Sequence, residues 1–249
     1  MNRRTLGMAA LALLLAAGAL AWLFVPRGRP PAQLPTPLAA KSPTLPGQGQ
    51  AERLAAARRA AFPDGPIVQD DELEIVFPGS QLVDAPFGPV LVSEGQVRHP
   101  LRITPGRIAV HYLRPAIRGF AIAEAYPRAI EGGSFGQVAG WRVSDRFTEF
   151  PVIYTEEGGT WQGVTCAQAM LTELTPQGPQ LIATVPLAYE NSGAVVDGSE
   201  VRSIEGQILN VERGRSFDVV YDGSERFTDT YVYRGGRFVR TGSAPRDWC

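Results

Sequence analysis

The sequence predicts an all-β domain, built as an antiparallel sandwich, a barrel or propeller-like blades, behind an N-terminal transmembrane helix, a Pro-rich spacer and one short helix. From residue 70 onward, short runs of alternating apolar and polar residues are separated by Gly, Pro and Asp, as in strands joined by tight turns. Residues 6–25 form a run of 20 uncharged, mostly apolar residues, and the next 25 residues contain seven prolines. We therefore divide the chain into residues 1–25, 26–49, 50–62 and 63–249.

The N-terminal apolar run predicts export of everything that follows it. Arg3 and Arg4 precede the run, and a helix of that length spans about 30 Å, the thickness of a bilayer's hydrocarbon core. Two interpretations remain open: an uncleaved membrane anchor, and a signal peptide cleaved after Ala21, the last residue of an Ala-x-Ala motif. The continued apolar sequence through Val25 favours the anchor. In both cases we expect residues 63–249 to fold outside the cytoplasm, in the periplasm or the extracellular space.

The next two segments are expected to hold the β-rich domain away from the membrane. Proline fixes φ and lacks a backbone donor, so residues 26–49 predict an extended, semi-rigid spacer; a Pro-rich ligand for a recognition domain is the alternative. Residues 50–62 are Ala-rich and contain neither Gly nor Pro, and Pro63 ends the predicted helix. We expect a thin apolar stripe that includes Leu54 to dock this helix on the domain, with self-association as the alternative.

Hairpin turns are the clearest local signals in the remaining sequence. Thr175–Pro179, Asp222–Ser224 and Gly235-Gly236 each separate two alternating runs, which is typical of antiparallel hairpins. Residues 167–174 also contain good helix formers, but we favour a strand there. The expected strands are 72–77, 90–92, 107–112, 141–147, 163–174, 180–189, 216–221, 228–233 and 237–241.

The charge distribution argues against a nucleic-acid partner. The whole chain has a formal net charge of −1, but residues 1–50 contain five basic residues and no acidic one. The other 199 residues therefore carry 19 basic and 25 acidic groups, a net charge of −6. An acidic folded domain lacks the positive field that binding to phosphate backbones needs.

One short motif resembles that of a nucleophilic serine. Gly132–Gly136 matches G-x-S-x-G, in which glycines permit a strained turn that exposes Ser134 between a strand and a helix. No helical period follows it, and both histidines precede it. A triad in the order Asp84, His111 and Ser134 is allowed, but nothing in the spacing specifies it. We expect a Gly-rich loop without catalytic function.

The two cysteines of the chain are expected to form a disulfide. In an oxidising compartment, Cys166 and Cys249 would close a loop of 84 residues. The chain-entropy model gives that bridge about 4–5 kcal/mol of stabilisation. The alternatives are two unpaired thiols and a nucleophilic Cys166 activated by a histidine.

Weaker patterns suggest metal or carbohydrate chemistry, but we assign no catalytic, cofactor-binding or metal-binding residue from them. The turns Asp197–Glu200 and Asp222–Glu225 could offer carboxylates to calcium, although each has only two. His99 and His111 lack the spacing of a zinc site. The pair Glu156-Glu157 could supply half of a glycosidase site, but carboxylates before the expected turn Gly158-Gly159 are usually solvated. Aromatic side chains could line a binding groove, although core positions are more common: Trp141, Trp161, Tyr154, Tyr189, Tyr231 and Tyr233.

These patterns together favour a non-enzymatic protein of the cell envelope. We expect a membrane-anchored chain whose exported domain binds or scaffolds another envelope component, an unknown protein or polymer. The other expected partner is the bilayer itself, through the N-terminal helix; no cofactor and no nucleic acid is expected. The alternative is a hydrolase that acts on cell-wall or extracellular material through carboxylates or Ser134.

Overall fold

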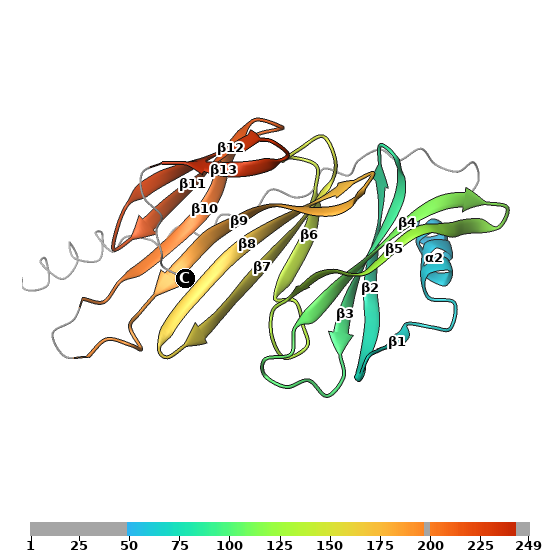
Figure 1. Ribbon diagram of the computed structural model, residues 1–249, viewed down its shortest axis with the longest axis horizontal. Coiled ribbons are helices and arrows are strands. Elements are labelled where there is room, and N and C mark those ends of the chain that lie inside the picture. The colour runs from blue at the N-terminus through green and yellow to red at the C-terminus, as the bar shows by residue number, and fades with distance from the viewer. Residues whose placement is uncertain (1–48, 197–199, 243–249) are drawn as a thin grey trace, which may run out of the picture. The chain divides into compact units, whose positions relative to one another are not determined.

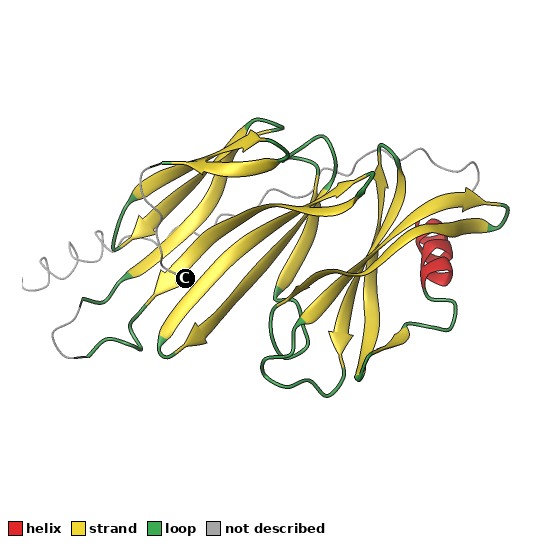
Figure 2. Ribbon diagram, in the orientation of Figure 1, coloured by secondary structure: helices red, strands yellow, loops and turns green. Residues whose placement is uncertain are grey.

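The computed structural model describes residues 49–196 and 200–242. The predicted membrane segment 1–25 and Cys249 lie outside these residues. Within them, no helix combines the length and the apolar character needed to cross a bilayer. The described chain consists of one helix and two antiparallel sheets (Figure 2), so the predicted all-β antiparallel class is confirmed.

The helix α2 spans Gln50–Ala61 and lies against the first sheet (Figure 1). Its absence of Gly and Pro lets the helix propagate, and it ends at Phe62, whose N–H bonds the Arg58 carbonyl at 2.8 Å. Ala57 is fully buried in a cluster with apolar side chains of the sheet, and Leu54 packs at its margin. The helix therefore docks on the β-rich domain, as its apolar stripe predicts.

The first sheet has five strands in sequence order, each paired antiparallel with the next. Alternate side chains point to opposite sides of the sheet. Those on one side pack against α2, and those on the other side pack against the second sheet. The strands are β1 (Ile67–Asp70), β2 (Leu73–Ala85), β3 (Gly88–Val97), β4 (Gly106–Ala116) and β5 (Gly119–Gly132).

The second sheet has eight strands, again in sequence order. Its strands β9 and β10 pair only where residues 188–190 meet residues 203–205, and the sheet curls there into a half-barrel. Aromatic and aliphatic side chains, among them Leu171, Phe217 and Phe238, fill the concave side. The strands are β6 (Gly140–Ser144), β7 (Val152–Trp161), β8 (Val164–Thr175), β9 (Gly178–Glu190), β10 (Ser203–Glu212), β11 (Ser216–Gly223), β12 (Phe227–Arg234) and β13 (Arg237–Thr241).

A shared hydrophobic core joins the two sheets. Val90 and Ile108 from the first sheet pack in one cluster with Ile153 and Leu174 from the second, and all four are fully buried. Burial of this apolar surface is the main favourable term for holding the sheets together. The two sheets therefore share a core, and no set of separate propeller blades and no closed barrel occurs among the described strands.

One expected turn, Gly158-Gly159, and the expected end of the strand at 72–77 lie inside longer strands instead. Gly158-Gly159 belongs to β7, where Gly158 pairs with Ala167 and Gly159 with Cys166. Pro78-Gly79 lies within β2, where a bulge between Val76 and Gly79 absorbs the proline and the strand continues to Ala85. Pairing with long neighbouring strands overrides the local turn preference at both places.

Other strand boundaries also differ from expectation. The strand expected at 141–147 ends at Ser144, and Phe147 instead enters the half-barrel core from a loop. Four strands were not expected from the sequence at all: β1, β5, β7 and β10. Residues 167–174 form a strand, as favoured.

Candidate binding surface

Asp84, His111 and Ser134 each contact different neighbours in the structure. Asp84 pairs with Arg53 of α2 at 2.7 Å, and both side chains are largely buried. His111 lies on β4, where its ring packs edge-on against Phe62 with centroids 5.4 Å apart. Ser134 is exposed in the loop after β5, where its N–H bonds the Gln137 carbonyl. These contacts bind each residue to different neighbours, and none of them joins two members of the expected triad.

His111 is a buried histidine in an apolar setting. Its burial lowers its pKa from the ordinary value of 6.5. Among the described residues, no group forms a hydrogen bond with its buried Nδ1. The neutral ring therefore packs between the sheet and the C-terminal end of α2.

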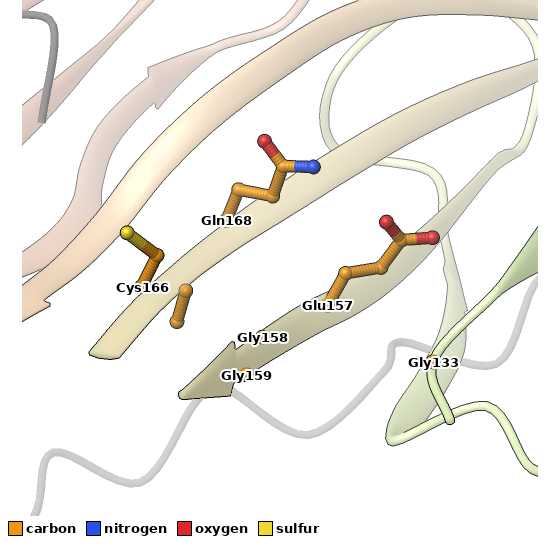
Figure 3. A pocket seen from close by; sticks show the side chains of 7 residues that line it. Gly133, Glu157, Gly158, Gly159, Cys166 and Gln168 are labelled. Atoms are coloured by element: carbon orange, nitrogen blue, oxygen red, sulfur yellow. The ribbon is translucent and has the colours of Figure 1, made fainter. Parts of the chain in front are cut away.

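A shallow pocket of about 290 Å³ lies where β7 and β8 pass the loop after β5 (Figure 3). Glu157, Gln168 and Cys166 project from one face of these paired strands, as their register requires. The Glu157 carboxylate lies directly over Gly132, where an added Cβ would be 1.7 Å from Oε1. The lining residues are Gly133, Glu157, Gly158, Gly159, Cys166, Ala167 and Gln168.

The pocket does not assemble the chemistry that the sequence suggested. Neither histidine lines it, so a histidine-activated Cys166 is not formed there. Glu156 and Glu157 point to opposite faces of β7, and Glu156 accepts a hydrogen bond from the Tyr154 hydroxyl at 2.8 Å. Because Cys249 lies outside the described residues, the bridge between Cys166 and Cys249 stays a prediction.

The suggested metal ligands are engaged elsewhere. Arg226 donates two hydrogen bonds to Asp222, at 2.9 and 3.1 Å, and these lower the pKa of that carboxyl. Glu225 pairs with Arg202, and Asp197 lies outside the described residues. In residues 49–196 and 200–242, no three His, Cys, Asp or Glu side chains gather closely enough to hold a metal ion.

The aromatic residues do not form one groove. Tyr231 stacks on Phe217 in the half-barrel core with centroids 4.8 Å apart, and Tyr233 packs against Phe238 at 5.0 Å. Tyr154 lies under the guanidinium of Arg142, 3.6 Å from its ring centroid. The remaining aromatics of the suggested groove make separate contacts or stay exposed: Trp141 bonds Glu94, Tyr189 lies 6.0 Å from Arg202, and Trp161 is 72% exposed.

Three loops instead expose four large apolar side chains, which we call the loop surface. Leu101 and Ile103 come from the β3–β4 loop, Phe135 comes from the β5–β6 loop, and Trp161 is the last residue of β7, directly before the β7–β8 turn. Their exposed fractions are 71%, 80%, 57% and 72%, respectively. Large apolar side chains exposed together mark interaction sites more often than single ones do.

Hydrogen bonds connect these loops. The N–H groups of Phe135 and Gly136 bond the carbonyls of Arg102 and Thr104 at 3.1 and 2.8 Å. Glycine is the only residue type that fits at position 136, because a Cβ there would lie 2.9 Å from the side chains of both Val97 and Pro100. The Arg102 side chain then reaches the Thr160 carbonyl at 3.4 Å, next to Trp161. The loop surface is thus a connected platform.

The backbone conformation of the loop tips is also unusual. Phe135 has φ of +50° and Gln162, beside Trp161, has φ of +51°. The left-handed region costs a residue with a side chain on the order of 1–2 kcal/mol, and a bulky ring rarely occupies it. Such outliers cluster at functional sites, where the surrounding structure holds them in place.

A second feature is a groove of about 490 Å³ between β9 and β13, which we call the strand groove. Leu181 and Val239 lie at its opposite sides, with exposed fractions of 54% and 40%. Among the described strands, β13 pairs only with β12, and the part of β9 from Gly178 to Leu187 pairs only with β8. Two open strand edges therefore face one groove.

Comparison with protein-family models, curated protein sequences and solved structures gives no match for this chain. The loop surface and the strand groove are therefore the two features from which we infer a function. A sequence signal for the loop surface existed, because Leu101 and Ile103 stand between Pro100 and Pro105, outside any strand pattern. No comparable signal marks the strand groove, which depends on the curl of the whole sheet.

Proposed function

We propose that this chain is a membrane-anchored protein of the cell envelope whose exported β-rich domain binds or scaffolds another envelope component. The proposed location rests on the apolar run of residues 6–25 and the Pro-rich segment behind it. The proposed binding role rests on one observation, the strand groove with an open strand edge on each side.

An open edge offers unpaired N–H and C=O groups, which an added strand can satisfy. Proteins often bind extended peptides in this way, with backbone hydrogen bonds supplying affinity and side-chain pockets supplying specificity. In the strand groove, Leu181 and Val239 offer apolar contacts, and Arg237 is exposed without an ion pair in the described part of the chain. We therefore expect an extended partner segment with apolar residues and at least one carboxylate.

Site-specific photo-crosslinking in the native envelope tests this role. A photoreactive amino acid replaces Val239 or Leu181, and a matched control replaces Leu209, which is 40% exposed like Val239 but does not line the groove. We expect one discrete adduct, identified by mass spectrometry, from the groove positions and not from the control. Val239→Lys, which adds a charge to the open edge, should remove the adduct formed from position 181.

Two results would overturn the proposal. Equal labelling from positions 181, 239 and 209 would show that the groove has no preferred occupant. A reporter fused after Cys249 that behaves as a cytoplasmic protein would contradict the proposed location.

A further inference from the structure

We propose that the loop surface lies on an anionic phospholipid bilayer, with its four apolar side chains in the interfacial region and Arg102 among the lipid phosphates. This inference rests on the proposed function only for the location of the domain beside a membrane. It assigns a surface different from the strand groove.

The composition of the loop surface matches an interfacial membrane contact. Residues 98–105, 133–137 and 160–165 contain two arginines and one histidine, and they contain no acidic residue. Residues 51–249, by contrast, carry a net charge of −6. Tryptophan and other apolar side chains flanked by basic residues are the usual combination at the boundary between headgroups and acyl chains.

The charges around the surface leave Arg102 available to phosphate. Arg98 pairs with Glu74 at 2.5 Å, whereas Arg102 forms no ion pair within the described ranges and bonds only the Thr160 carbonyl. Two carboxylates lie beside these loops: Glu74, which pairs with Arg98, and Glu157, whose carboxylate lies over Gly132. A local positive charge on an acidic domain selects a negative surface and orients the domain on it.

The geometry also suits a flat partner. The three loops lie at the same end of their sheets (Figure 1). Backbone hydrogen bonds join the β3–β4 and β5–β6 loops, and the Arg102 side chain reaches the Thr160 carbonyl beside the β7–β8 turn.

A probe on the loop surface of the full chain tests the inference directly. An environment-sensitive fluorescent amino acid replaces Ile103, and in a matched control it replaces Ile117, the fully exposed tip of the β4–β5 hairpin. Each protein is incorporated into nanodiscs of a zwitterionic phospholipid, with or without an added anionic phospholipid. We expect a blue shift, and quenching by spin-labelled lipid, at position 103 in the anionic discs but not at position 117.

Reversing the charge of Arg102 provides a second test of the inference. Arg102→Glu should weaken the bilayer contact roughly five- to thirtyfold, because each charge step near an anionic surface is worth a factor of about five. Arg118→Glu, beside Ile117, is the matched control and should leave the emission at position 103 unchanged. Unchanged thermal melting of both variants in detergent establishes that the fold is retained.

The inference is wrong if position 103 is as exposed to water as position 117 in anionic discs, or if Arg102→Glu has no effect. A photo-crosslinker at position 103 that labels a protein instead of lipid would also overturn it. If the full chain does not enter nanodiscs, it is mixed instead with vesicles of the same two lipid compositions. The fluorescence at positions 103 and 117 is then compared in the same way and tests the inference. Loss of crosslinking at the strand groove, in contrast, bears on the proposed function alone.

Discussion

The Tyr112 hydroxyl on β4 donates a buried hydrogen bond of 2.6 Å to the Thr175 carbonyl at the end of β8. It is a polar contact inside the apolar core that the two sheets share. Burial is the main cause that raises the pKa of Tyr112, so the phenol remains a neutral donor at physiological pH.

Tyr112→Phe should therefore lower the free energy of unfolding by about 1–3 kcal/mol, because the buried Thr175 carbonyl loses its donor. Chemical denaturation monitored by tryptophan fluorescence measures the loss. Tyr126→Phe is the control, since its hydroxyl bonds the exposed Glu124. Equal stability of the Tyr112→Phe variant and the unchanged protein would show that the two sheets do not depend on this bond.

The ion pair between Arg53 and Asp84 should be the main polar attachment of α2. Their side chains are 7% and 10% exposed, so removing one partner leaves an uncompensated buried charge. We expect Arg53→Met to cost about 3–5 kcal/mol. Arg226→Met, which breaks the exposed pair with Asp222, should change stability little. Similar losses in both variants, measured by denaturation, would contradict this account of helix docking.

Because His111 is buried, we expect the protein to lose stability in mild acid. Burial lowers its pKa in the folded protein, so the unfolded chain binds the proton more readily below about 6.5. The contribution of neutral His111 is fully present above that value and declines as the pH falls toward the lowered pKa. Unfolding midpoints measured between about pH 7 and 5.5 should fall in the unchanged protein and remain nearly flat in His111→Leu.

The only other histidine provides the control for this pH dependence. His99 is exposed in the β3–β4 loop, and His99→Gln should retain the pH dependence of the unchanged protein. If His111→Leu and the unchanged protein follow the same pH profile, the titrating group is not His111.

The predicted bridge between Cys166 and Cys249 should be visible in peptide maps of exported protein. A cross-linked peptide should occur without reductant and disappear with it. Cys166→Ser and Cys249→Ser should each cost about 4–5 kcal/mol, and the double variant no more than either, because all three remove the same closed loop. Free thiols at both positions would refute the bridge.

Local hairpins were predictable because their signals are local. The turns at Thr175–Pro179 and Gly235-Gly236 lie between runs whose alternation sets the register, and both hairpins occur. β7 was hidden because Gly158-Gly159 has the local preference of a turn. Its extension to Trp161 depends on ten successive pairings with β8, which no local pattern encodes.

The sequence by itself determined the antiparallel β class, the helix before it and the acidity of the folded part, since these follow from period, composition and charge along the chain. Only the tertiary structure decided which residues meet. Leu101, Phe135 and Trp161 lie far apart in the chain and come together through hydrogen bonds between loops. The open edges of β9 and β13 face each other because the eight-stranded sheet curls. Both surfaces arise from non-local packing, in which the burial of one shared core fixes where distant loops and edges must lie.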